Sequence, residues 1–501
     1  MKKKTFATLC AALFSAVALQ AVTFTGPITV TAYGSTNTTT VTVQADQNAN
    51  GLYTFQLSVP MFGTMVMNDV PAVTVGSITT FTCERNVGTT LGTMRTVLTA
   101  RMTGSEGHEM MAADVRIPDH AVTMWFNTVG DYFQLPNSNM EAWTNSNGEP
   151  DRWHGFETAK GGFASMSAGI AKLEKSTDIH SGAEGSYSAV MTAGSFWGIV
   201  GNGTMTNGRL NAGSMTATDT KNHAEMSASS TEVDPNGFPF YMPLYAKPDA
   251  LSLWMKYVPK NSSDRASVSA AAFNGDYYQE PYDSDYACVA GRITGGASIA
   301  PCDWTQVSFP FDYATYVNNH ADANSIFVTF STNSHPGSGS SGDAVYVDDI
   351  ALVYLAEITD LRYKGETIEG WVPSARKSYD MTLDAAPEAD DFTADVTGAS
   401  AVLTKTIEQT GDNTWRVTIS AVSGDLQTAQ YHIFKITVDT PVTVLPGDVN
   451  GDGAVDPADI AALINYLLIG APVNEANADV NQDGGIDPSD ISTLINMLLR
   501  N

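Results

Sequence analysis

The sequence has few basic residues and no long internal apolar run, and each shortage excludes a class of protein. Of its 501 residues, 26 are Lys or Arg and 54 are Asp or Glu, so the formal net charge is −28. A chain this acidic offers no positive surface for a phosphate backbone, so we expect no nucleic-acid partner. No internal stretch approaches the roughly 20 apolar residues that a membrane-spanning helix needs.

The composition instead indicates a folded, mainly β protein of several domains. Charged residues make up only 16% of the chain, whereas 43% are hydrophobic and 9% aromatic, which excludes a mostly disordered protein. Thr, Val, Ser and Gly are abundant and helix-forming residues are scarce. At about 100–200 residues per domain, this length predicts several domains in series.

The N-terminal segment has the pattern of an export signal. Lys2, Lys3 and Lys4 precede an apolar run from Phe6 to Leu19, which ends at small residues around Ala21. This pattern predicts a cleaved signal over residues 1–21 and a protein that is periplasmic, exposed on the cell surface or extracellular.

Few cysteines remain once such a signal is removed. They are Cys83, Cys288 and Cys302, and the last two flank a glycine-rich segment between strand-like runs. An exported protein is permitted disulfides, so a Cys288–Cys302 bridge across a hairpin is one expectation. The alternative is that all three are unpaired and buried.

Residues 22–129 alternate between apolar and polar side chains in short runs separated by polar turns. Examples are 39–43 and 52–57, joined by a turn at 48–51. Short strands with close-spaced turns predict an antiparallel meander or barrel. The runs at 22–26 and 50–55 resemble the calycin-like barrel domain of exported Bacteroidetes proteins. That resemblance implies a small β-barrel and no particular ligand.

Residues 130–355 form the largest expected unit, and its last strand carries two aspartates, in the segment 342–354. This strand resembles the closing strand of carbohydrate-binding jelly rolls. The whole segment is similar to the "putative carbohydrate metabolism" domain of Bacteroidetes, through its aromatic opening and the runs at 201–208, 253–257 and 326–331. The resemblance implies a jelly-roll β-sandwich with a glycan-related role. By comparison with related jelly rolls, Glu141 and Asp349 are candidate ligands of one structural Ca²⁺.

Residues 356–440 again read as short strands, among them 415–419 and 431–438. A segment of this length suits an immunoglobulin-like sandwich, which we expect to act as a spacer. A linker over residues 441–446 then leads to a different kind of sequence.

The C-terminus contains a duplicated pattern of oxygen-bearing side chains. The segment Asp448–Asp459 recurs 31 residues later as Asp479–Asp490, with glycine at loop position 6 of each copy. Ca²⁺ prefers six to eight oxygen ligands, and this spacing wraps such ligands around one point. The expected ligands of two ions are Asp448, Asn450, Asp452, Ala454, Asp456, Asp459, Asp479, Asn481, Asp483, Gly485, Asp487 and Asp490.

Each loop precedes a predicted helix with an N-cap aspartate, Asp456 or Asp487, followed by proline. Two such units in tandem resemble a type I dockerin over residues 447–501. The resemblance implies calcium-dependent folding and docking to a cohesin-type partner. Pro457-Ala458 and Ile464-Asn465 depart from the best-known recognition pattern, so the cohesin is not identified. Candidate partner-binding residues are Ala458, Tyr466, Ile469, Ser489 and Met497, the alternative being that Tyr466 and Met497 pack within the protein.

No catalytic residue can be assigned from the sequence. A glycosidase needs two carboxylates across a cleft, and spacing alone cannot select a pair among 54 acids. For sugar binding, Tyr277, Tyr278 and Tyr282 stand in a polar segment and are candidates for contact with a glycan. Trp143, Trp153 and Trp197 are further candidates, although core packing is the favoured alternative for the first two.

Three functions are consistent with these patterns. The first is a secreted, non-catalytic protein of polysaccharide utilisation, which binds glycan through its jelly roll and docks through its calcium-loaded dockerin. The second is a glycoside hydrolase or esterase that uses the central domain. The third is a surface adhesin without catalysis.

Overall fold

The computed structural model describes residues 21–103, 109–129, 133–281, 287–374, 376–439 and 445–500. The predicted export signal up to residue 20, linker residues 441–444 and Tyr282 lie outside these residues. The protein is mainly β and multidomain, with two near-barrel sheets and a small helical region at the C-terminus. Among the helices described, none is long and apolar enough to cross a membrane.

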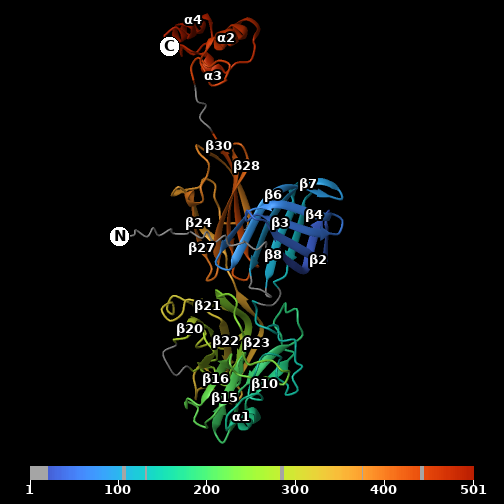
Figure 1. The fold of residues 1–501 in the computed structure, drawn as a ribbon. Helices are drawn as coiled ribbons and strands as arrows, with labels where there is room; N and C mark the ends of the chain where they lie inside the picture. Colours follow the sequence, from blue (N-terminus) through green and yellow to red (C-terminus); the bar gives the residue numbers. More distant parts are fainter. Residues whose placement is uncertain are drawn as a thin grey trace, which may run out of the picture. The chain divides into compact units, whose positions relative to one another are not determined.

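The first sheet curls into a near-barrel (Figure 1), with strand order β4-β3-β2-β1-β9-β8-β7-β6-β5. Its strands are β1 (Ala21–Ala32), β2 (Ser35–Gln47), β3 (Tyr53–Val59), β4 (Gly63–Val70), β5 (Ala72–Val75), β6 (Ile78–Thr89), β7 (Gly92–Thr103), β8 (Met110–Ile117) and β9 (Val122–Asn127). A 3₁₀ turn, η1 (Pro118–His120), joins the last two strands.

Side-chain alternation explains the inside and outside of this barrel. In β3, Tyr53, Phe55 and Leu57 are buried while Gln56 and Ser58 face solvent, as the period of two requires. The two ends of the sheet are brought together by Arg85 of β6, whose Nη2 donates to the Asp69 carbonyl of β4 at 2.8 Å. The sequence-based barrel is therefore confirmed as a near-barrel.

The central domain contains a second nine-stranded sheet, with order β10-β11-β23-β17-β21-β20-β18-β22-β14. Its strands are β10 (Lys172–Ser176), β11 (Ser188–Thr192), β14 (Thr204–Thr206), β17 (Ala250–Val258), β18 (Ser267–Phe273), β20 (Val289–Ile293), β21 (Cys302–Asp312), β22 (Ser325–Ser331) and β23 (Ala344–Val353). The remaining elements are α1 (Ala164–Ile170), β12 (Gly194–Phe196), β13 (Ile199–Gly201), β15 (Arg209–Ala212), β16 (Asn222–Ser227) and β19 (Tyr277–Glu280).

The long strand β21 joins the two halves of this sheet. Residues 302–310 of β21 pair with β17, whereas Phe311 and Asp312 pair with β20. Residues from both halves, including Leu253, Val268, Phe330 and Val347, share one buried core. The two halves therefore belong to one sheet that folds over at a shared strand, and the jelly-roll sandwich stays a prediction.

The Cys288–Cys302 disulfide expected from the sequence is not seen. Neither residue forms a disulfide in the structure. Cys288 Sγ lies 3.9 Å from the Tyr277 carbonyl oxygen, and Cys302 pairs with Tyr257 across β21 and β17. Each thiol therefore lies against a different strand. Cys83 is buried in the barrel, and burial raises the pKa of its thiol to about 11.

The following segment forms two small sheets, with orders β25-β24-β27 and β26-β30-β29-β28. Their strands are β24 (Glu357–Tyr363), β25 (Glu366–Thr367), β26 (Arg376–Leu383), β27 (Phe392–Thr397), β28 (Val402–Gly411), β29 (Thr414–Val422) and β30 (Ala429–Val438), with a 3₁₀ turn, η2 (Ala389–Asp391). The described part of this segment thus has seven strands in two sheets, and the immunoglobulin-like architecture stays a prediction.

The C-terminal region is helical and is formed by α2 (Pro457–Ile469), α3 (Glu475–Ala478) and α4 (Pro488–Leu498). The Asp456 side chain accepts from Ala458 N at 2.7 Å, and Asp487 accepts from Ser489 N at 2.7 Å, so both predicted N-caps are confirmed. Gly470 ends α2 with a φ of 67°. The short helix α3 is not predicted by the repeat.

Candidate functional site

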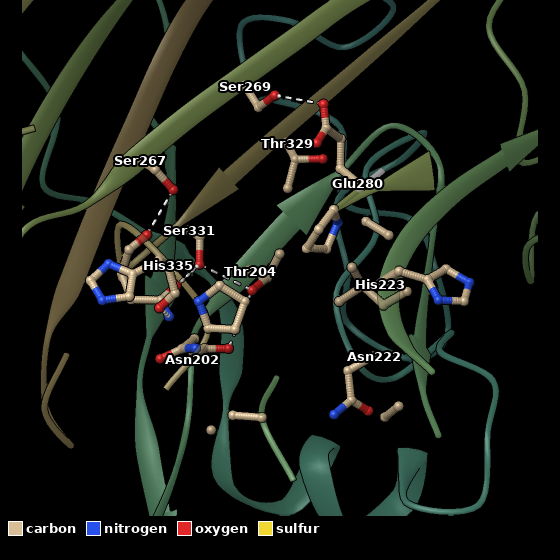
Figure 2. Close-up of a pocket in the computed structure, with 18 of the residues that line it drawn as sticks. Asn202, Thr204, Asn222, His223, Ser267, Ser269, Glu280, Thr329, Ser331 and His335 are labelled. Atoms are coloured by element: carbon tan, nitrogen blue, oxygen red, sulfur yellow. Dashed lines mark hydrogen bonds between the residues drawn. The ribbon is translucent and has the colours of Figure 1, made fainter. Parts of the chain in front are cut away.

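A cavity of about 440 Å³ lies in the central domain. Its walls are contributed by β14, β18 and β22, by β15 and β16, by α1 and by β13. Figure 2 shows Ser267 and Ser331 on one side of the cavity and Asn222 and His223 on the other. This volume is in the range of small-ligand pockets.

One wall is a grid of hydroxyl groups from three neighbouring strands. Ser267 of β18 pairs with Ser331 of β22, which pairs with Thr204 of β14. In the next row that faces the same way, Ser269 pairs with Thr329. The intervening residues, such as Val268 and Phe330, belong to the core. Strand alternation therefore gives this sheet one hydroxyl-bearing face and one apolar face.

Glu280, at the end of β19, is the single acidic residue among the described residues that line the cavity. Its Oε1 accepts from Ser269 Oγ at 3.3 Å and also from Tyr278 and Arg292. The Glu280 side chain is only 14% exposed, and Arg292 provides the compensating charge. Glu280 is thus a fixed hydrogen-bond acceptor in an ion pair.

A second charged network lies behind His223. His223 Nε2 is 3.0 Å from Glu225 Oε2, and Lys160 forms an ion pair with the same carboxylate. Hydrogen bonding to Glu225 raises the pKa of His223, against the effect of burial. Burial by itself raises the pKa of Glu225, but hydrogen bonds from His223 and Lys160 outweigh it and lower this pKa to about 2. The network therefore favours a protonated imidazole at the cavity wall.

Amide side chains complete the polar lining. Asn202, Asn211, Asn222 and Asn333 line the cavity together with the hydroxyl grid. The Asn202 Oδ1 atom is buried and has no hydrogen-bond partner within the described part of the chain. Apolar side chains also line the cavity, among them Phe156, Phe163, Met166 and Ile293. Neutral polar groups together with apolar ones suit a ligand with hydroxyl groups and an apolar face.

The cavity was not found by sequence reasoning, and most of the aromatic candidates lie elsewhere. Tyr278 is fully buried between Phe273 and Phe327, so its ring is unavailable for stacking on a sugar. Tyr277 is 45% exposed, and its hydroxyl donates to Gln279 and Glu225. Trp153 is buried, as its core-packing alternative predicts, and Trp143 is partly buried. Trp197 is 86% exposed.

The candidate calcium ligands Glu141 and Asp349 have protein partners. Glu141 Oε1 accepts from the backbone N of Ser186 at 2.7 Å and of Tyr187 at 2.8 Å, and Asp349 Oδ2 is 2.8 Å from His180 Nε2. Burial raises the pKa of the neighbouring Asp348 to about 7, and the charges of Asp349 and Glu141 add to this effect. Among the described residues, neither this place nor the C-terminal loops has three or more His, Cys, Asp or Glu side chains gathered around one point. A calcium ion at Glu141 and Asp349 stays a prediction.

The two C-terminal loops have the same internal hydrogen bonds. In the first loop, Asp448 accepts from the backbone N of Asp452 and Gly453, and Asp459 accepts from that of Asn450 and Asp456. In the second loop, Asp479 and Asp490 take the equivalent roles.

The donor set of these loops fits calcium. Asp459 and Asp490 are fully buried and Asp448 is 5% exposed, although each carries a carboxylate. The remaining expected ligands are carboxylate, amide or backbone oxygens, the donor type that Ca²⁺ prefers. A cation would offset the cost of burying these carboxylates.

The two long helices leave much of their apolar surface exposed. Ile464, Leu468 and Leu499 are 37%, 75% and 79% exposed. The region is too small to cover both helix faces, and only Leu463 and Leu494 of α2 and α4 are fully buried among the apolar residues. Of the candidate partner-binding residues, Tyr466 is partly buried, and Ala458, Ile469, Ser489 and Met497 are exposed.

Residues 446–499 match the family described as the dockerin type I domain. The chain carries a C-terminal type I dockerin. A search of curated protein sequences found no match.

Solved structures that resemble this chain include two from Bacteroides. One, from Bacteroides vulgatus ATCC 8482, is described as a "putative glycoside hydrolase"; it is 13% identical, with a TM-score of 0.27 over 36% of this chain and 76% of that chain. The other, from Bacteroides thetaiotaomicron VPI-5482, has the same description; it is 12% identical, with a TM-score of 0.33 over 50% of this chain and 81% of that chain. These values are too low to carry an argument about function.

Proposed function

We propose that the protein is an exported glycan-binding protein of polysaccharide utilisation, which holds glycan in the central cavity and is recruited to an assembly through its dockerin. The observation that carries this proposal is the hydroxyl grid in a cavity that is also lined by apolar side chains. A pyranose ring has hydroxyl groups around its edge and C–H groups on its faces, so its chemistry complements this lining.

The charges of the cavity favour binding over hydrolysis. A glycosidase of the common type uses two carboxylates, about 5–10 Å apart. Among the described lining residues, Glu280 is the single carboxylate, and it is engaged in an ion pair with Arg292 and in hydrogen bonds from Ser269 and Tyr278. A neutral hydroxyl lining also gives specificity, because a ligand that lacks the matching groups leaves it unpaired.

The dockerin supplies the second half of the proposal. Type I dockerins imply docking to a cohesin module, and the apolar surface on α2 and α4 provides an anchor. Ile464 and Leu468 of α2 are repeated 31 residues later as Ile495 of α4 and Leu499, and all four side chains are exposed. An apolar patch repeated in both halves of so small a module indicates a surface that a partner covers.

A glycan array with the full-length protein tests the binding function. The double variant Thr329→Val with Ser331→Ala removes two hydroxyls of the grid and is expected to weaken binding of the captured glycan about tenfold. Thr38→Val is the matched control, because the Thr38 hydroxyl shares a hydrogen bond with the Thr29 hydroxyl on the outer surface of the barrel. Unchanged binding in the double variant would exclude the cavity as the site. Reducing-sugar release from the same glycans would indicate a hydrolase instead.

A further inference from the structure

The hairpin β12–β13 carries an exposed pair of aromatic side chains beside the cavity. Phe196 is 39% exposed and Trp197 is 86% exposed, the highest exposure among the large apolar side chains described. The following strand of the same hairpin contributes Ile199, Val200 and Gly201 to the cavity wall. The aromatic pair therefore continues a surface that already belongs to the cavity.

The base of the hairpin packs closely against α1. Gly194 and Gly201 are directly paired across the two strands, and both face Ile170. A Cβ atom at Gly194 would lie 1.8 Å from the Ile170 carbonyl oxygen, and one at Gly201 would lie 2.8 Å from Ile170 Cδ1. A side chain at Gly194 would collide with the helix backbone, so this glycine lets the hairpin lie against a helix that itself lines the cavity.

The tip of the hairpin presents one open aromatic face. The rings of Phe196 and Trp197 are stacked, with centroids 4.9 Å apart and an interplanar angle of 17°. Phe196 thus covers one face of the indole and leaves the other to solvent. Trp197 and Gly198 have φ angles of 48° and 80°, the backbone of a two-residue hairpin turn.

The distance from tip to cavity is short. Trp197 precedes Ile199 by two residues, so their Cα atoms are at most about 7.6 Å apart. We propose that Phe196 and Trp197 form an aromatic platform on which a sugar ring that projects from the cavity stacks, so that the ligand is a glycan chain and not a single sugar. This inference rests on the proposed glycan-binding function of the cavity.

The physical basis is the burial of apolar surface. The C–H face of a pyranose ring is apolar, and covering it with an indole removes both surfaces from water. Trp is well suited to this, because it offers a large rigid area with few rotatable bonds. A ring held only inside the cavity gains nothing from Trp197, whereas a chain that leaves the cavity along β13 does.

Trp197→Asn tests the platform. Asn suits the positive φ of this turn position, so the variant removes the aromatic ring without opposing the backbone. Tyr33→Asn is the matched control: Tyr33 is 64% exposed, has a φ of 52° and precedes Gly34 in a barrel hairpin. Titration calorimetry of the full-length protein uses an oligosaccharide captured on the array and its constituent monosaccharide.

We expect Trp197→Asn to weaken oligosaccharide binding about tenfold and to leave monosaccharide binding unchanged. Tyr33→Asn should alter neither. If the wild-type protein binds glycan and Trp197→Asn binds the oligosaccharide equally well, the aromatic platform is excluded, while the cavity remains the proposed glycan site. If the wild-type protein binds no glycan, both proposals fail. If Trp197→Asn instead turns a dimer into a monomer in sedimentation, the platform is a contact between copies and the inference is overturned.

Discussion

At the scale of single residues, the cavity depends on side chains whose charge is fixed by their neighbours. Glu280 is paired with Arg292, and Glu225 is paired with His223 and Lys160. Both acids are held in ion pairs, and Arg292 and His223 lie in the lining themselves, while the remaining polar lining consists mainly of neutral hydroxyls and amides. This lining offers directional hydrogen bonds to a ligand.

The His223–Glu225 pair predicts a pH-dependent stability. Because Glu225 raises the pKa of His223 above its ordinary 6.5, the folded state binds a proton more tightly than the unfolded state. The stabilisation from the His223–Glu225 pair is fully present below pH 6.5 and is lost as the pH rises through the raised pKa of His223. We expect His223→Gln to cost about 1 kcal/mol at pH 5.5 and less at pH 9, measured by urea unfolding.

His335→Gln is the control for this measurement. His335 also lines the cavity, but its Nδ1 is 3.0 Å from the neutral Ser334 hydroxyl. A loss of stability that is the same at every pH in His223→Gln would contradict the charge pairing.

At the scale of elements, the sequence was sufficient for the dockerin but not for the cavity. The calcium loops, the caps at Asp456 and Asp487 and the two long helices are encoded locally, within one repeat. The cavity instead depends on pairing between Thr204 and Ser331, which are 127 residues apart. The available signal was the alternation Ser267-x-Ser269 and Thr329-x-Ser331 within apolar strands.

Aromatic side chains were a poor guide to that site for a physical reason. Tyr277 and Tyr278 are neighbours on β19, and strand alternation places one ring outside and the other in the core. Sequence alone does not say which of two adjacent aromatic residues faces the core, because that depends on the register with β16. The buried Tyr278 contributes only its hydroxyl, which donates to Glu280.

The calcium loops predict a stoichiometry. Asp459 and Asp490 are fully buried at loop position 12, so each is expected to be essential to one ion. Asp459→Ala and Asp490→Ala should each lower the calcium content of the full-length protein by one ion relative to the wild type, measured by plasma mass spectrometry after dialysis. Asp384→Ala removes an exposed carboxylate outside the dockerin and should leave the calcium content unchanged. Wild-type calcium content in all three variants would show that position 12 is not a ligand.

The exposed leucines predict the docking surface. Leu468 and Leu499 occupy equivalent places at the ends of α2 and α4. The double variant Leu468→Ser with Leu499→Ser should weaken capture by a panel of purified type I cohesins by about 1–3 kcal/mol, with calcium content unchanged. Leu91→Ser is the control, since Leu91 is 52% exposed in a barrel turn. Equal capture of the wild-type protein, the leucine double variant and Leu91→Ser by the cohesins would place the docking surface elsewhere.

At the scale of the whole molecule, the segment 356–440, for which an immunoglobulin-like spacer is predicted, forms hydrogen bonds with the barrel. Several buried polar groups of the barrel strands β6 and β7 bond to this segment. Thr80 Oγ1 donates to Thr404 Oγ1 at 2.7 Å, and Arg416 Nη2 donates to Thr82 Oγ1 at 2.7 Å. Because buried polar groups are costly to leave unpaired, these bonds favour a fixed contact between the two domains.

Arg101 is the strongest test of that contact. It is 2% exposed on β7; its Nε donates to the Leu426 carbonyl at 2.5 Å, and its Nη1 donates to the Tyr431 hydroxyl at 3.0 Å. Arg101→Met keeps much of the side-chain length but leaves these acceptors without a donor. The free energy of unfolding is expected to fall by about 1–3 kcal/mol, and the barrel and the predicted immunoglobulin-like domain should separate into two calorimetric transitions.

Arg95→Met is the control on the same strand. Arg95 is 37% exposed and pairs with Asp119 at the surface, so its substitution should lower the free energy of unfolding by less than about 1 kcal/mol. Suppose that Arg101→Met and Arg95→Met lower the free energy of unfolding equally and leave the shape of the calorimetric melting curve unchanged. The two domains are then linked by the chain alone, and the predicted immunoglobulin-like domain acts as a spacer.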